Sequence, residues 1–191
     1  MASLVVDQRE VQRRGGICAK VPTACIVADL LKEAGIEARN LLVFDITYGQ
    51  GRFWAKIRPR VLIGADVAVL EWVVEPDIFI KKPAWQSWRL VKQLGIRVDL
   101  VAVDPPWSDR GSSLRHHFGI DRALGGPKPI LEAAACAARE LRAQYLLVHY
   151  KTRYVPQGFS VVAEMEWLPV TRYIDYSKAK PTTWWGLLRR G

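Results

Sequence analysis

The sequence predicts an α/β fold in which helices cover a mostly parallel β-sheet. Three observations lead to this prediction. Short continuous apolar runs, typical of buried parallel strands, alternate along the chain with segments of helical periodicity. Half of the 191 residues are apolar, which is enough for a sizeable core. The two most distinctive loops follow predicted strands, at the sheet edge where ligands of such folds bind.

The first half of the chain contains one clear helix and three predicted strands. The helix is expected over residues 23–34, because Pro22 and Thr23 form a start signal and Gly35 a stop. A second helix is expected to begin within residues 53–58, and residues 67–74 fit either a helix or a strand. The apolar runs that predict strands cover residues 40–46, 61–65 and 77–80.

The second half continues this alternation. Helices are expected over residues 85–94 and 129–142, on either side of a polar, glycine-rich loop at 108–128. Strands are expected over residues 98–103, 145–149, 159–167 and 171–176, the last two as an antiparallel pair. We expect one domain over residues 1–191, with an N-terminal arm at 1–19 that is either mobile or an edge strand. The basic, aromatic tail at 177–191 would dock a partner or cover a sheet edge.

Composition excludes several classes of protein. The sequence has no apolar run long enough for a membrane span and no secretory leader, so we expect a cytoplasmic protein. The three cysteines, Cys18, Cys25 and Cys136, form no CxxC pair, and the histidines lie at no familiar metal spacing. Isolated thiols and no bound metal are therefore expected. A formal net charge of +9 favours a polyanionic partner such as nucleic acid.

A glycine-containing loop follows the first predicted strand. Gly49 and Gly51 allow a sharp turn and let a ligand approach the backbone closely. The dinucleotide fingerprint fails because its third glycine would fall at Trp54, and no phosphate-loop motif is present. An ordinary tight turn is the alternative. Asp66, at the end of the second strand, is either a surface acid or an acceptor for both ribose hydroxyls of a nucleoside.

The most specific segment is Asp104-Pro105-Pro106-Trp107, which follows the buried strand at 98–103. The two prolines fix the backbone and remove two amide donors. A carboxylate at Asp104 and the carbonyl of Pro105 can then accept both N–H groups of a planar amine, such as adenine N6 or cytosine N4. Trp107 offers a face on which a base can stack. The alternative is a plain loop with a core tryptophan.

In these two segments the sequence resembles the amino-methyltransferases that modify exocyclic amines of bases, in the group whose S-adenosylmethionine (SAM) motif comes first. Their [DNS]-PP-[YFW] signature is matched at residues 104–107. Their FxGxG loop is matched at 45–51, and Val21-Pro22-Thr23 is loosely similar to their upstream segment. The resemblance implies a three-layer Rossmann-like SAM-methyltransferase fold. Its sheet would have seven strands, mostly parallel, with an antiparallel edge pair.

The resemblance also implies a cofactor, a reaction and site residues. The cofactor would be SAM, and the product an N-methylated adenine or cytosine in DNA or RNA. Catalysis would rest on Asp104, Pro105, Pro106 and Trp107. Cofactor contacts would come from Pro22, Thr23, Asp45, Thr47, Tyr48, Gly49, Gly51 and Asp66. Basic residues after the catalytic loop would meet substrate phosphates, unless they are only a solvated face: Arg110, Arg115, His116 and Lys128.

Several alternatives stay open at this point. No stretch is long enough for a separate target-recognition region, so either a partner protein reads the target or an RNA is recognised by shape. A catalytically silent nucleic-acid-binding partner subunit would keep the same fold. A methyltransferase acting on a protein amide would usually carry Asn where this chain has Asp104. A cytosine-C5 methyltransferase needs a cysteine nucleophile, and Cys136 lies in an alanine-rich helix.

Overall fold

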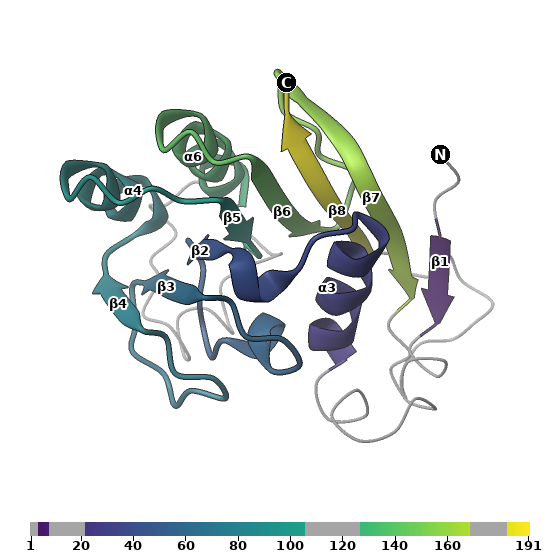
Figure 1. The fold of residues 1–191 in the computed structure, drawn as a ribbon, viewed down its shortest axis with the longest axis horizontal. Coiled ribbons are helices and arrows are strands. Elements are labelled where there is room, and N and C mark those ends of the chain that lie inside the picture. Colours follow the sequence, from purple (N-terminus) through teal and green to yellow (C-terminus); the bar gives the residue numbers. More distant parts are fainter. Residues whose placement is uncertain (1–3, 8–21, 106–126, 169–182) are drawn as a thin grey trace.

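The computed structural model describes residues 4–7, 22–105, 127–168 and 183–191. Within these ranges the strands form one twisted sheet in the order β1-β7-β8-β6-β5-β2-β3-β4 (Figure 1). β8 runs antiparallel to both of its neighbours, and every other pairing is parallel. The strands are β1 (Leu4–Asp7), β2 (Leu42–Asp45), β3 (Val61–Asp66), β4 (Ile78–Lys81), β5 (Leu100–Val103), β6 (Tyr145–Tyr150), β7 (Phe159–Leu168) and β8 (Thr183–Arg190).

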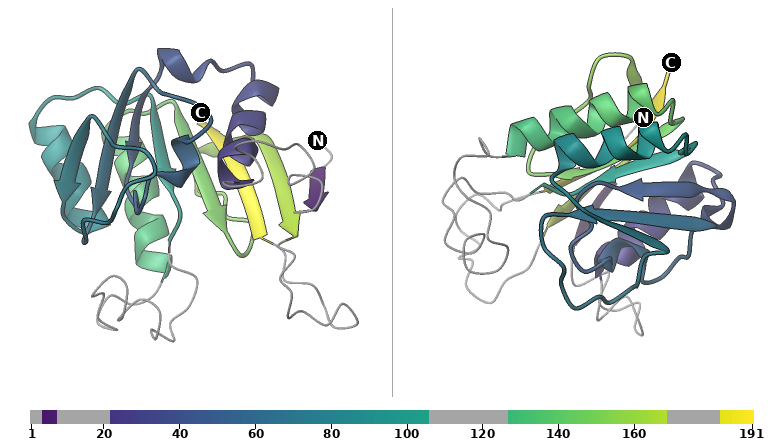
Figure 2. Two further views of the ribbon diagram at one scale, coloured as in Figure 1. Left: turned by 90° about the horizontal axis from the view of Figure 1, so that it is seen from below. Right: turned by 90° about the vertical axis from the view of Figure 1, so that its left-hand side faces the viewer.

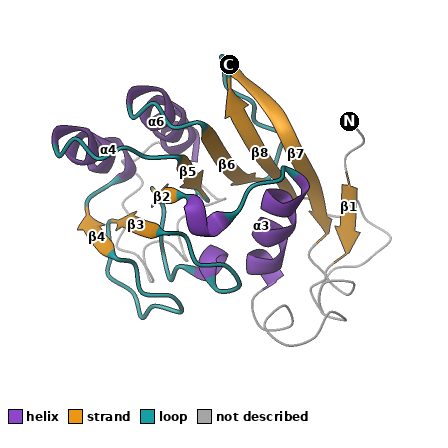
Figure 3. Cartoon of the chain, in the orientation of Figure 1, coloured by secondary structure: helices purple, strands orange, loops and turns teal. Residues whose placement is uncertain are grey.

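Helices cover both faces of this sheet (Figures 2 and 3). One face carries α3 (Pro22–Glu33) and the short 3-10 helix η2 (Arg52–Trp54), with a second 3-10 turn, η1 (Ala38–Asn40), after α3. The other face carries α4 (Ala84–Gln93) and α6 (Pro127–Glu140). None of the described helices is long and apolar enough to cross a bilayer.

The two faces bury alternate residues of the same strands. In β2, Val43 packs on the α3 face, whereas Phe44 packs on the face of α4 and α6. In β8, Trp185 and Trp184 divide in the same way. Because both faces are covered, the central strands are apolar on both sides and read as continuous runs in the sequence.

The order of the strands creates a switch point between β2 and β5. From β2 the chain proceeds outward to β3 and β4, whereas from β5 it proceeds the other way to β6. The connections after β2 and β5 therefore diverge at the carboxyl edge of the sheet. Open α/β sheets bind their ligands in the crevice between connections that diverge in this way.

The predicted fold class is confirmed: the chain forms a three-layer, mostly parallel α/β sheet. The seven strands of the expected pattern are joined by β1, so the N-terminal arm supplies an edge strand beside β7. One strand of the antiparallel pair was wrongly placed. The strand beside β7 is β8, from the segment predicted as a tail, and it lies inside the sheet. The strand predicted at 171–176 lies outside the described residues.

Three local predictions also need correction. The helix expected from 53–58 is only η2, because Pro59 disfavours helical geometry at Arg58. Residues 67–74 form neither a helix nor a strand. Cys25 is not an isolated thiol but is disulfide-bonded, whereas Cys136 is free. Sequence spacing does not report which cysteines the fold brings within bridging distance.

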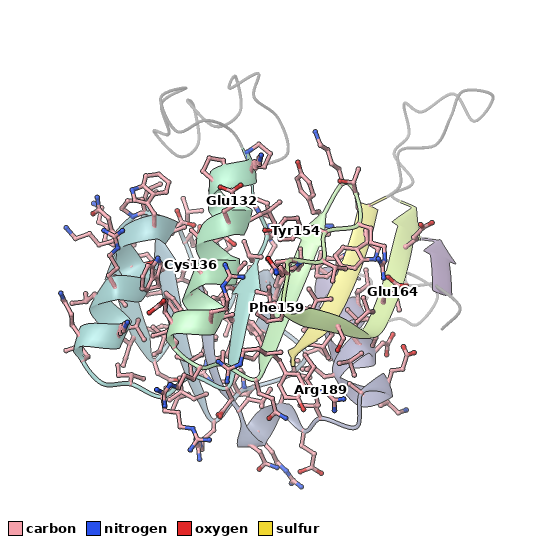
Figure 4. All side chains as sticks on the ribbon, turned by 90° about the horizontal axis from the view of Figure 1, so that it is seen from above. Glu132, Cys136, Tyr154, Phe159, Glu164 and Arg189 are labelled. Atoms are coloured by element: carbon pink, nitrogen blue, oxygen red, sulfur yellow. The ribbon has the colours of Figure 1, made fainter. Side chains whose placement is uncertain are left out.

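A cluster of polar side chains links β7 to β8. Glu164 lies on β7 (Figure 4). It accepts the indole N–H of Trp184 on β8 at 2.9 Å, and it also pairs with Arg153 at 2.9 Å. The side chains of Arg153 and Trp184 lower the pKa of Glu164 despite the opposing effect of burial. The ionised carboxylate therefore fixes the indole of Trp184 against the sheet.

Candidate active site

A cleft of about 340 Å³ opens at the switch point. It lies beside the loops that follow β2 and β5, together with part of the segment after β3. The volume is within the roughly 300–1,000 Å³ typical of small-molecule sites. Its lining residues are Asp45, Thr47, Tyr48, Gly49, Gln50, Arg52, Phe53, Leu70 and Asp104.

A direct hydrogen bond joins the two loops. The backbone N–H of Asp104 donates to Thr47 Oγ1 at 2.7 Å. Pairing of β2 with β5 sets this geometry, because Asp45 lies opposite Ala102 and both loops leave the sheet side by side. Residues 47–50 and Asp104, which are far apart in the sequence, therefore converge on one cleft.

Asp45 is the buried acid at the base of the cleft. Its carboxylate accepts the indole N–H of Trp54 at 2.9 Å and the backbone N–H of Thr47 at 3.2 Å. Burial raises the pKa of Asp45 to about 7, with smaller upward contributions from the charges of Asp104 and Asp66. The hydrogen bonds oppose this shift. Asp45 is therefore poised to exchange a proton near neutral pH.

The glycine loop is held by Tyr48. Gly49 and Gly51 adopt left-handed backbone conformations, with φ of 54° and 72°. The Tyr48 hydroxyl donates to the carbonyl of Val74 at 2.6 Å, and the ring packs where a side chain on Gly64 would otherwise lie. Burial is the main reason that the pKa of Tyr48 is raised. Tyr48 is thus chiefly a loop anchor that also forms part of the cleft wall.

Asp66 braces the same loop from β3. Its carboxylate accepts the backbone N–H of Gly49 at 2.9 Å and that of Ala68 at 3.3 Å. Burial raises the pKa of Asp66, and these backbone hydrogen bonds oppose the shift. Asp66 is not among the residues that line the cleft. The predicted ribose acceptor is therefore engaged with the loop backbone.

The structure brings together only part of the predicted site. Gly51 is buried behind Tyr48, and Thr23 is half-buried at the start of α3 after Pro22, away from the cleft lining. Lys128 is exposed on the first turn of α6, 3.8 Å from Glu132. Asp45, Thr47, Tyr48, Gly49 and Asp104 share the cleft, and Pro105 is the buried residue after Asp104. The predicted site residues that lie outside the described ranges are Pro106, Trp107, Arg110, Arg115 and His116.

Sequence reasoning missed His149. Pairing of β5 with β6 places Val103 opposite Val148, so the next residues, Asp104 and His149, are neighbours. His149 Nδ1 lies 3.0 Å from Asp104 Oδ1. A histidine at the carboxyl end of an apolar strand was the available signal, but its meaning depends on which strand lies beside it. Among the described residues, no cluster of acids, histidines and cysteines is arranged to hold a metal ion.

Comparisons with known proteins identify the fold. No protein-family model and no curated protein sequence matches the chain. A solved structure of SMU.776, described as a methyltransferase and complexed with SAH, superposes with a TM-score of 0.53. It is 8% identical over 84% of this chain and 48% of that one. A Streptococcus mutans protein described as a SAM-dependent methyltransferase gives 0.50, with 9% identity over 86% and 48%. The chain thus spans about half the length of these proteins, and shares their fold.

Proposed function

We propose that the protein is a SAM-dependent methyltransferase that modifies an exocyclic amino group of a nucleic-acid base. One observation carries this proposal: Thr47 Oγ1 and the backbone N–H of Asp104 meet at 2.7 Å, on a cleft at the switch point. A cofactor on the glycine loop and an amine at Asp104 would therefore be adjacent. Adjacency of two reactants is the main requirement of a transfer that needs no protein nucleophile.

The cleft residues fit the chemistry of SAM. SAM carries a sulfonium and an ammonium group, and the cleft contains the carboxyl group of Asp45. Phe53 and Leu70 add apolar surface suited to the adenine ring. Gly49 lets a ligand approach the backbone, since a side chain there would meet nothing nearer than 4.0 Å. Bound SAM supplies an electrophilic methyl group.

Asp104 and Pro105 are suited to orient the acceptor amine. The Asp104 side chain is 36% exposed, so a substrate can reach it. Its carboxylate and the Pro105 carbonyl would accept the two amine N–H groups, which directs the nitrogen lone pair towards the cleft. A net charge of +9 supports a nucleic-acid substrate. Lys128 would meet a phosphate, as would Arg110, Arg115 and His116, while Trp107 would stack on the base.

A silent nucleic-acid-binding partner subunit is the second candidate. The observation in its favour is Asp66, whose carboxylate accepts two backbone N–H groups instead of lining the cleft. A carboxylate has about four acceptor sites, so these contacts reduce its capacity for ribose hydroxyls without removing it. Such a subunit would bind nucleic acid without SAM.

The test combines cofactor binding with methyl transfer. The protein is titrated with SAM by calorimetry and incubated with isotopically labelled SAM and separate pools of DNA, rRNA and tRNA. Nucleosides are then analysed by mass spectrometry. We expect one SAM per chain and label in N6-methyladenosine or N4-methylcytidine, or their deoxy forms. Nucleic-acid binding without SAM binding would support the silent subunit instead.

Asp104→Ala tests the assigned acceptor. It should lower methyl transfer by at least about 100-fold, because a mispositioned amine alone costs that much. SAM binding should stay within about threefold, since the backbone N–H that holds Thr47 is retained. Glu33→Ala, which removes an exposed carboxylate from the end of α3, is the control and should stay active. An active Asp104→Ala variant would refute the role of Asp104.

A further inference from the structure

His149 is a buried polar side chain on β6 with a polar neighbour beside each ring nitrogen. Nε2 is hydrogen-bonded, whereas Nδ1 lies at ion-pair distance from Asp104 without the geometry of a hydrogen bond. Nδ1 lies 3.0 Å from Asp104 Oδ1, and Nε2 lies 3.2 Å from Thr183 Oγ1. Only 4% of the His149 side chain is exposed. Thr183 begins β8, whose antiparallel direction brings it to the same sheet edge as Asp104. β8, β6 and the connection after β5 thus contribute one residue each to the row Thr183–His149–Asp104.

Aromatic packing fixes the plane of the imidazole ring. The ring stacks on Trp185 with a centroid separation of 3.8 Å and an interplanar angle of 13°. Phe53, which lines the cleft, lies 6.3 Å from the His149 ring and 4.9 Å from the Trp185 ring. The imidazole therefore cannot rotate away from Asp104 without disturbing the core beneath the cleft.

We propose that His149 is a positioning residue for Asp104: a small rotation of the partly exposed carboxylate lets Nδ1–H donate to it, and this hydrogen bond holds the carboxylate in the orientation that receives the substrate amine. The inference rests on the proposed function, because it assigns Asp104 the task of binding that amine. It concerns a residue that neither the sequence motifs nor the structural likenesses single out.

The hydrogen-bond chemistry determines the tautomer. An ionised carboxylate only accepts hydrogen bonds, so the proposed bond requires the proton on the nitrogen that faces Asp104. In the neutral ring, Nε2 is then an acceptor, and the Thr183 hydroxyl can donate to it. Each of the three side chains then has a complementary hydrogen-bonding role. A partner on one ring nitrogen is the usual way in which a histidine tautomer is selected.

The geometry explains why Asp104 needs such a holder. Asp104 begins a connection after β5 and its side chain is partly exposed, so the strand alone does not fix its carboxylate. A carboxylate has about four lone-pair sites, and a bond to His149 uses one of them. Acceptor capacity remains for an amine N–H, now at a fixed angle. Misplacement of a reacting group by about 1 Å can cost about 100-fold in rate.

Two substitutions separate positioning from packing. His149→Phe keeps an aromatic ring on Trp185 but removes both nitrogens. His149→Asn loses the stacked ring but keeps an amide N–H that can occupy the place of Nδ1–H. We expect His149→Phe to lower kcat by about 10- to 100-fold, with little change in the KM for SAM. His149→Asn should stay within about fivefold of the wild-type kcat despite weaker packing. Melting temperatures and SAM titrations verify that both variants are folded.

A second measurement does not depend on activity. ¹⁵N NMR of the histidine-labelled full chain reports which ring nitrogen of His149 carries the proton. We expect the Nδ1–H tautomer in the wild type and a mixture in Asp104→Ala, which removes the acceptor. His149→Phe identifies the signal by its loss.

The outcomes are distinguishable. Retained kcat in His149→Phe, a loss in His149→Asn as large as in His149→Phe, or an Nε2–H or doubly protonated ring in the wild type would each overturn the inference. An inactive wild type that binds no SAM would overturn the proposed function itself. In that case the NMR measurement still decides whether His149 donates to Asp104.

Discussion

At the scale of single residues, Asp45 couples the cleft to pH. Burial raises its pKa from 3.8 to about 7 in the folded chain. Between these two values the folded protein binds more protons than the unfolded chain, so stability from this group falls as pH rises through that window. Above pH 7 both states are ionised, and the full cost of burying the charge is present.

This gives a prediction about stability. The unfolding free energy of the wild type should fall by about 1–3 kcal/mol more between pH 5 and pH 8 than that of Asp45→Asn, which cannot ionise. Urea unfolding at the two pH values measures the difference. Asp45→Asn loses one carboxylate oxygen that Trp54 or Thr47 uses, so only the change with pH is informative. Equal changes in both proteins would show that Asp45 does not titrate in this range.

Gly51 has a packing reason for being glycine. Its φ is 72°, and a Cβ atom there would lie 2.5 Å from the Tyr48 hydroxyl and 2.7 Å from the Val74 carbonyl. A side chain would thus break the contact that anchors the glycine loop. The sequence predicts that Gly51 lets a ligand approach the backbone, whereas in the structure it is Tyr48 that packs against this glycine.

Gly51→Ala should therefore destabilise the fold and weaken SAM binding. Gly95→Ala is the matched control, because Gly95 has a similar φ of 67° but nothing within 4 Å of the added Cβ. We expect Gly95→Ala to cost about 1 kcal/mol, for the left-handed backbone alone, and Gly51→Ala about 1–3 kcal/mol more. Chemical unfolding and SAM calorimetry measure both effects. Equal behaviour of the two variants would contradict the role of Tyr48.

The site residues at strand ends could be predicted from the sequence, whereas contacts between residues of different strands could not. Asp45, Gly49 and Asp104 were recognisable because each ends a strand or lies in the loop that follows one, where parallel strands expose their ligand edge. His149 acquires its meaning only from the register that sets Val103 opposite Val148. The backbone contacts of Asp66 were likewise invisible, since they depend on how closely the glycine loop folds back over β3.

At the scale of elements, β8 shows where pattern reading fails. Residues 183–188 are all buried, because β8 has strands on both sides and helices on both faces. An apolar run without alternation cannot be distinguished from a docking segment by periodicity. The strands from β2 to β7 were recognised because each is a short apolar or alternating run bounded by loop residues. The tail was misread because its helical neighbours come from distant parts of the chain.

β8 also contains a specific packing requirement. The Trp184 ring covers Gly186 two residues later on the same face, and an added Cβ would collide with it. Gly186→Ala should destabilise the protein by about 1–3 kcal/mol. The loss of unfolding free energy should be smaller in a Trp184→Leu background, and a double-mutant cycle by urea unfolding measures the difference. Additive effects of the two substitutions would mean that the indole does not fill this space.

At the scale of the whole molecule, the switch point organises both fold and site. The glycine loop and Asp104 are brought together by the reversal of strand order between β2 and β5, not by their spacing in the sequence. The α/β class, the parallel sheet and the position of its ligand edge could be predicted, because periodicity and connection handedness leave few topologies. The number of strands could not be predicted, because β1 pairs with the open edge of β7, and this edge exists only once the sheet has folded.

The position of β8 also affects how the chain can fold while it is being translated. β8 is synthesised after β7 yet lies between β7 and β6, so the sheet cannot grow in the order in which its strands leave the ribosome. A nascent chain that has released only β6 and β7 exposes two unpaired edges, which are the surfaces most prone to misassociation. Trp185 and Thr183 arrive with β8. The floor beneath the cleft is therefore completed only after nearly every other element has been made.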